Sequence, residues 1–194
     1  MPSIRVVSTK NDSVDRKRDV LNSFLDTFIA KGLSETSVRD LSASIHTQSA
    51  GMYYYFPSKE DAVVACAEEA AIRLENTLIM PALKDVSNPE KLIKHLGSRA
   101  EEMAPTMKFL IQVCAVPKYE ELIRPALDRL SQRYIHYSQL FAEKIGCSKE
   151  EIEPYMYMSI TAVTNYMVFN EKEYIRPQMQ MAQRALEHLL KKES

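Results

Sequence analysis

Residues 36–61 read TSVRDLSASIHTQSAGMYYYFPSKED, and this stretch determines the fold that we expect. Ser37 is a favourable N-cap and Asp40 follows three residues later, the arrangement of a capping box that starts a short helix. A second short helix is predicted over Gln48–Phe56, because apolar side chains lie four apart there and Pro57 ends the run. Helices of only about nine residues bury little by themselves, so the pair needs further helices as a base.

Two interpretations of this spacing are open. The two helices can form a hairpin that only packs in a bundle, or a helix-turn-helix whose second helix enters the major groove of DNA. The flanking segments supply the base in either case. Apolar residues recur at helical spacing from residues 12–13 to Gly32, which suits a left-handed cap. A fourth helix begins at a capping box in residues 58–61 and runs on to the residue before Pro81.

Composition and proline positions extend this helical prediction to the whole chain. The 194 residues contain only 4 Gly and no Trp, and 45% are hydrophobic, which favours an all-α protein large enough for one or two domains. A formal charge of −1 excludes a polycation that grips nucleic acid by charge alone. Pro125 should kink or break its helix. Further helices are predicted over about 89–103, 105–115, 118–145, 149–170 and 173–192.

Residues 36–41 and 46–61 closely resemble the DNA-binding signature of the tetracycline-repressor (TetR) family of bacterial regulators. The resemblance is strong over about residues 14–65, and the remainder matches in length and helical count. It implies an N-terminal tri-helical helix-turn-helix DNA-binding domain at residues 1–60, preceded by a short flexible tail. A larger helical ligand-binding and dimerisation domain is implied at residues 61–194.

The resemblance assigns DNA contacts to this motif. Gln48 and Ser49 stand at the positions that read the major groove, where Gln can bond to adenine and Ser to several base edges. Lys59 matches the family's phosphate-binding lysine at the start of a helix. The implied DNA-binding residues are Arg39, Gln48, Ser49, Gly51, Tyr53, Tyr54, Tyr55 and Lys59.

Several of these assignments have a structural alternative. Successive helical positions turn about 100° each, so one of the three tyrosines at residues 53–55 should pack inside, and we expect Tyr55 to contact phosphate. Arg39 can instead pair with a neighbouring acid, and Lys59 can be an ordinary surface lysine.

Two positions depart from the family pattern. His46 stands where a turn glycine is common, so a left-handed backbone there would be slightly strained. Gly51 replaces a hydroxyl or amide side chain at a cost of about 1 kcal/mol of helix propensity, and its backbone could approach DNA closely. Residues 1–59 hold 8 Lys+Arg and 6 Asp+Glu, so the basic residues 16–18 must help to contact roughly four to six phosphates per subunit.

The C-terminal helices are predicted to form a homodimer. The segment from Pro154 to Asn170 has no charged residue and is apolar around most of a helix, which suits burial on two sides. By resemblance, this helix and the apolar stripe within residues 179–190 form a four-helix dimer interface. A twofold dimer would then place two recognition helices on a palindromic DNA site.

A set of mainly apolar residues can line an inducer cavity in this domain, although a methionine-rich stripe is more often plain core. The candidate pocket residues are Met103, Met107, Leu110, Cys114, Tyr134, Tyr137, Thr161 and Asn165, with Phe109 and Phe141 beside them.

These observations predict a dimeric transcriptional repressor that a small-molecule inducer releases from its operator. The alternative is a DNA-bound adaptor or activator that recruits a protein partner and senses no ligand. An enzyme has little support, because the four histidines lack metal-ligand spacing and no phosphate loop or nucleophile elbow appears. We therefore expect no cofactor and no metal. The three cysteines lack close spacing, and neither an export signal nor a membrane span is evident, which favours the cytoplasm.

Overall fold

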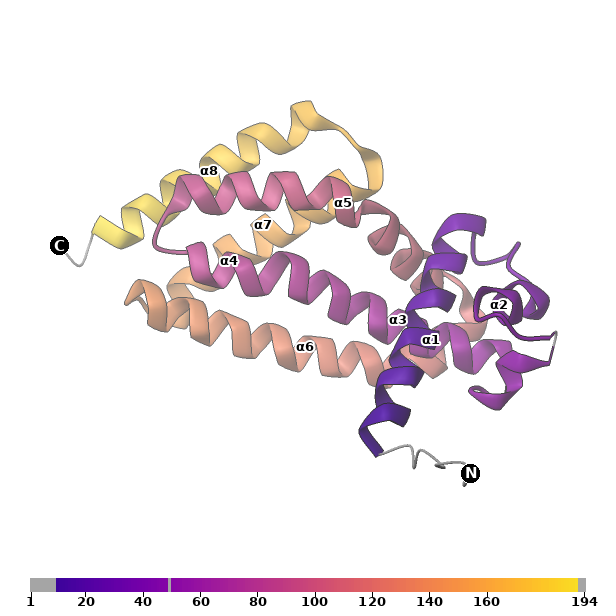
Figure 1. The fold of residues 1–194 in the computed structure, drawn as a ribbon. Helices are drawn as coiled ribbons and strands as arrows, with labels where there is room; N and C mark the ends of the chain where they lie inside the picture. Colours follow the sequence, from indigo (N-terminus) through magenta and orange to yellow (C-terminus); the bar gives the residue numbers. More distant parts are fainter. Residues whose placement is uncertain (1–9, 49, 192–194) are drawn as a thin grey trace, which may run out of the picture. The chain divides into compact units, whose positions relative to one another are not determined.

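The helical elements of the chain fall into two units. The computed structural model describes residues 10–48 and 50–191, and every regular element in these ranges is a helix (Figure 1). The first unit ends at Glu69 and the second begins at Ala70, inside helix α3 (Lys59–Leu74). The predicted boundary after residue 60 lies earlier in the same helix. The predicted all-α class is confirmed for the described part of the chain.

The first unit is built from α1 (Lys10–Lys31), α2 (Val38–Ser44), the short 3₁₀ helix η1 (Gly51–Tyr54) and the first part of α3. The predicted flexible tail falls largely on residues 1–9, which lie outside the described residues.

Local signals end α1 and begin α2 as predicted, whereas α1 begins at Lys10, before the cap predicted at residue 12 or 13. Gly32 has a φ of +91°, the left-handed conformation that glycine adopts without a Cβ clash, and it ends α1. Ser37 caps α2, because its hydroxyl accepts from the Asp40 amide at 3.2 Å while the Asp40 carboxylate accepts from the Ser37 amide at 2.8 Å. His46 has a φ of +56°, so the left-handed turn residue is also confirmed.

The second helix of the motif is shorter and tighter than the helix predicted over Gln48–Phe56. The structure has only η1 there, with the amides of Gly51 and Tyr53 bonding three residues back at 2.8 and 3.1 Å. The Met52 amide donates instead to the Ser42 hydroxyl at 3.1 Å. This contact with α2 diverts an amide that a regular α-helix would use, and glycine adds low helix propensity, so the α-helix prediction was wrong.

Aromatic and aliphatic side chains from all four helices form the core of the first unit. The ring centroids of Phe24 on α1 and Phe56 after η1 lie 5.9 Å apart. The side chains that are almost completely buried include Phe24, Leu25, Phe28, Leu41, Met52 and Val63. The small core fixes the orientation of α2 and η1 on their base.

The second unit continues from the end of α3. Its elements are the π-helix η2 (Glu75–Ile79), α4 (Met80–Asp85), α5 (Pro89–Ala115), α6 (Pro117–Ile145), α7 (Lys149–Phe169) and α8 (Lys172–Lys191). Helix α7 packs against α5, α6 and α8, and α5 also contacts α8 (Figure 1). No helix among the described residues has the length and apolar character needed to span a membrane.

Three prolines that were expected to interrupt helices lie inside helical runs. Pro105 and Pro125 are exposed within α5 and α6, where solvent can satisfy the carbonyl that each proline leaves without an amide partner. Pro81 follows the π-helix, and His95 Nε2 lies 3.2 Å from the Thr77 carbonyl, the one that would accept from residue 81 in a regular helix. The predicted helix ends before Pro81 and Pro105 were therefore wrong, and of the kink or break predicted at Pro125 the break does not occur.

Candidate nucleic-acid interface

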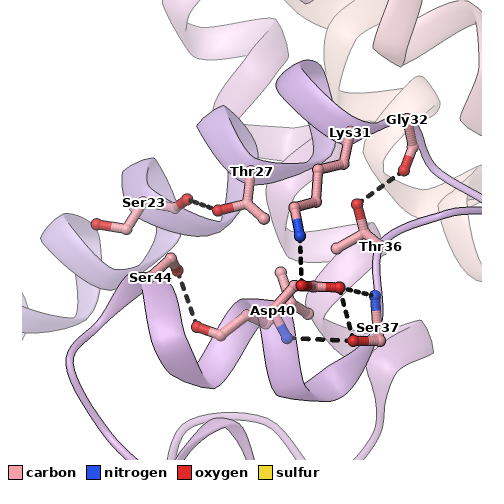
Figure 2. A network of polar contacts seen from close by, with 9 residues as sticks. Ser23, Thr27, Lys31, Gly32, Thr36, Ser37, Asp40 and Ser44 are labelled. Carbon is pink, nitrogen blue, oxygen red and sulfur yellow. Dashed lines mark hydrogen bonds and ion pairs between the residues drawn. The ribbon is translucent and has the colours of Figure 1, made fainter.

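An ion pair and a capping box hold α2 against the end of α1 (Figure 2). Asp40 accepts from Lys31 of α1 with one carboxylate oxygen, and from the Ser37 amide at 2.8 Å and hydroxyl at 2.6 Å with the other. The hydrogen bonds from Lys31 and Ser37 hold the pKa of Asp40 well below its usual value. The predicted capping residue therefore also ties two helices together.

The turn between α2 and η1 is organised by two hydroxyl residues, Ser42 and Thr47, whose contacts the sequence did not predict. The buried Ser42 hydroxyl accepts a hydrogen bond from the Met52 amide, and the Thr47 hydroxyl donates one to the Ser42 carbonyl at 2.9 Å. A Cβ at Gly51 would lie 1.8 Å from Thr47 Oγ1 and 2.4 Å from its Cβ. Glycine is thus required by the fold of the turn itself, a reason different from the close approach to DNA that we considered.

The side chains predicted to read DNA are unequally exposed. Gln48 is exposed, and Tyr53 and Tyr54 are 55% and 85% exposed. Tyr55 is half-buried, and its ring makes an edge contact with the Tyr54 ring at 5.0 Å. Ser49 lies outside the described residues. The structure therefore presents Tyr53 and Tyr54 more openly than Tyr55, which we expected to contact phosphate.

The two predicted basic contacts also differ. Arg39 is exposed on α2, and no acidic side chain among the described residues pairs with it. Lys59, the first residue of α3, is half-buried and donates from Nζ to the Leu33 carbonyl at 3.3 Å. An ammonium group has three donors, so Lys59 retains two for a phosphate.

Much of the positive charge near the start of α1 is already engaged. Arg18 Nε lies 3.5 Å from the carboxylate of Glu69, and Lys17 Nζ lies 5.4 Å from the centre of the Phe56 ring. Arg16 is exposed. The charge available for phosphates is smaller than the composition of the first unit suggests.

The second unit contains a mainly apolar cavity of about 350 Å³. Four of the predicted pocket residues line it: Met107, Leu110, Tyr134 and Tyr137. Met103 is buried in a core cluster with Ala100 and Val163, because it faces the packed side of α5. The other predicted residues lie elsewhere: Cys114 is exposed, and Thr161 and Asn165 line a separate groove of about 710 Å³ along α7 and the start of α8.

Two charged residues in the cavity wall were missed. Glu75 on η2 and Arg133 on α6 form an ion pair at 3.1 Å, and the Tyr137 hydroxyl donates to the same carboxylate. Burial and the bond to Glu75 raise the pKa of Tyr137 to about 12. Glu75 could not be distinguished from a solvated surface residue in the sequence, because the π-helix changes the direction of the side chains around it. Arg133 has the same pattern as the other charged residues of α6, so its spacing did not mark it either.

The described chain thus combines a helix-turn-helix unit with a helical unit that contains an apolar cavity. Residues 24–66 match the sequence model of the bacterial regulatory proteins of the tetR family, so the predicted resemblance is confirmed and the chain carries that family's N-terminal domain. No curated protein matches the chain significantly.

Solved structures extend the likeness in fold beyond this domain. A TetR transcription regulator from Haloarcula marismortui aligns over 90% of this chain and 98% of its own, with 13% identity and a TM-score of 0.67. A putative TetR-family regulator from Mesorhizobium loti aligns over 94% and 97%, with 15% identity and a TM-score of 0.65. The multidrug binding protein EbrR, complexed with imidazole, aligns over 90% and 94%, with 16% identity and a TM-score of 0.60. The chain therefore has the fold of a TetR-family transcriptional regulator.

Proposed function

We propose that this protein is a dimeric DNA-binding repressor that a small molecule releases from a palindromic operator. The observation that carries the proposal is the exposure of the Gln48, Tyr53 and Tyr54 side chains on either side of a turn that the bond from the Met52 amide to the Ser42 hydroxyl holds in place. An amide side chain can read a base edge, and tyrosine hydroxyls can bond to phosphates. Ser49 shares this role by its position in the motif.

The proposed dimer uses the outer faces of α7 and α8. Tyr157 and Phe169 on α7 are each 68% exposed and Met181 on α8 is 52% exposed, which is unusual for large apolar side chains. The predicted α8 stripe contributes less than expected, because its Leu186 and Leu189 are buried within the same unit. A twofold pairing of these faces would give each operator half-site one recognition surface.

The proposed inducer site is the apolar cavity. A volume of about 350 Å³ is within the usual range for small-molecule sites. A ligand that favours the non-binding conformation by about 1–3 kcal/mol would weaken operator binding about 5- to 150-fold. Because its target is cellular DNA, we place the protein in the cytoplasm.

Selection from a random duplex pool tests the DNA-binding part without knowledge of the operator. We expect enrichment of an inverted repeat whose half-sites lie about one helical turn apart, with a nanomolar Kd. Sedimentation should show two protein copies per selected duplex. Failure to enrich any sequence would contradict a specific regulator, and enrichment of a single half-site bound by one copy would contradict the dimer.

A further inference from the structure

The polar end of the cavity contains one deeply placed negative charge and one positive charge that reaches it from the surface. The Glu75 side chain is 11% exposed, whereas the side chain of its partner Arg133 is 48% exposed. The Tyr137 hydroxyl adds a neutral donor to the same carboxylate. The rest of the wall is almost entirely apolar, so this carboxylate is the strongest electrostatic feature that a ligand would meet.

The two charges differ in how easily they can leave the pair. The Glu75 side chain is nearly buried, so its carboxylate cannot turn into solvent, and without a charge partner it would be poorly solvated where it lies. The long Arg133 side chain is half in solvent, so its guanidinium can turn outward and remain hydrated. A ligand can therefore replace Arg133 beside Glu75, whereas it cannot readily replace Glu75 beside Arg133.

The surrounding aromatic rings suit a positive group. Tyr134, Tyr137 and Tyr155 line the same cavity as Glu75. Tyrosine faces attract cations, quaternary ammonium groups included, and a nearby carboxylate strengthens the attraction. The apolar remainder of the cavity, with residues such as Leu78, Leu110 and Phe141, would cover a hydrocarbon body.

We propose that the cavity selects apolar organic cations, with the positive group of the ligand taking the place that Arg133 occupies beside Glu75. Arg133 is then an internal competitor that closes the site when no ligand is bound. An apolar anion would meet the Glu75 carboxylate, and a neutral molecule would gain nothing from it. The inference rests on the proposed function only in naming this cavity as the inducer site.

Three probes with one chain length test the selectivity in the wild-type protein. Calorimetric titration with decyltrimethylammonium, decanoate and 1-decanol, each below its aggregation concentration, compares cationic, anionic and neutral groups on the same apolar body. We expect decyltrimethylammonium to bind at least about tenfold more tightly than either of the others. Equal affinity for all three, tighter binding of decanoate or no binding of the cation would overturn the proposal.

Two substitutions locate the effect. Glu75→Gln should remove the preference for the cation, whereas Glu120→Gln, an exposed change on α6 outside the cavity, should leave it unchanged. Arg133→Gln should tighten binding of the cation by about threefold or more, with Arg124→Gln on the same helix as its control. Circular dichroism checks the fold of each variant. If Arg133→Gln does not fold, the wild-type series and Glu75→Gln still decide.

Failure of this inference is distinguishable from failure of the proposed function. Binding of decanoate in preference to the cation, together with release of the selected duplex, would leave an inducible repressor with a different ligand class. Binding of the cation without any change in DNA affinity would keep the ligand class and contradict ligand-controlled release.

Discussion

The first unit and the cavity each contain a carboxylate that accepts from a half-exposed cation and from a hydroxyl, but they use this arrangement differently. Asp40 also accepts a backbone amide and joins two helices, so it keeps the Ser37 amide and hydroxyl even where the exposed Lys31 turns away (Figure 2). Glu75 instead lies against an apolar cavity, and its cation can leave for solvent. The comparison indicates that the first carboxylate fixes a surface, whereas the second leaves a place for a ligand.

The largest expected effect tests how rigid the proposed DNA-binding surface is. Gly51→Ala should lower the free energy of unfolding of the first unit by about 3 kcal/mol, because the new Cβ would overlap Thr47 close to its backbone. Thermal or urea unfolding measures the loss. Gly97→Ala is the matched control, since a Cβ there meets nothing within 4 Å, and it should stabilise α5 slightly. Similar effects of both changes would show that the turn is adaptable.

The second prediction compares the two cations. Arg133→Met should reduce stability by about 2 kcal/mol, because it leaves the nearly buried Glu75 carboxylate without its charge partner. Lys31→Met should cost less than about 1 kcal/mol, because Asp40 keeps the Ser37 amide and hydroxyl. Urea unfolding of both variants shows which of them loses more free energy of unfolding. The reverse order would refute the distinction between the two carboxylates.

The third prediction concerns the cap of α2. Ser37→Ala should destabilise the first unit by about 1 kcal/mol, because the Asp40 amide loses its acceptor. Ser37→Thr, which keeps the hydroxyl, should recover most of the loss in the same unfolding experiment. A Ser37→Ala variant as stable as the wild type would show that Lys31 alone is sufficient to hold α2.

The smallest effects are expected in the pH dependence of stability. The folded state lowers the pKa of Asp40, so its contribution is present above its usual value of 3.8 and is lost as the pH falls further. The folded state raises the pKa of Tyr137 from 10 to about 12, so that contribution is present below pH 10 and is lost as the pH rises through 12. Asp40→Asn should flatten only the acid limb of a stability profile, and Tyr137→Phe only the alkaline limb. An effect of either change on the opposite limb would contradict these assignments.

The sequence predicted the parts of the molecule that local chemistry decides. The Gly32 cap and the Ser37 capping box depend on residues a few positions apart, and both were found as expected. The helix over Gln48–Phe56 was wrong because a hydroxyl ten residues before Met52 captures its amide. Contacts of this kind are invisible to a periodic pattern.

The cavity was less predictable for a related reason. Four predicted lining residues lie on its wall because they follow the apolar faces of α5 and α6. The π-helix places one more residue in its turn than an α-helix, so side chains before and after it that have helical spacing in the sequence do not lie on the same face. Glu75 on that turn therefore could not be assigned to the cavity from its spacing.

The most direct test of the central claim is a fluorescence anisotropy titration of the selected duplex and a scrambled duplex across a salt series. We expect nanomolar specific binding and a salt dependence no steeper than that of roughly four to six phosphate contacts per subunit, because Lys17 and Arg18 already have partners within the unit. Gln48→Ala should relax the sequence preference by about 1–3 kcal/mol, whereas Tyr54→Phe should weaken binding to both duplexes, and more than Tyr55→Phe does. Gln139→Ala, an exposed change on α6, should have no effect. Equal affinity for the two duplexes, unaffected by Gln48→Ala, would contradict the account.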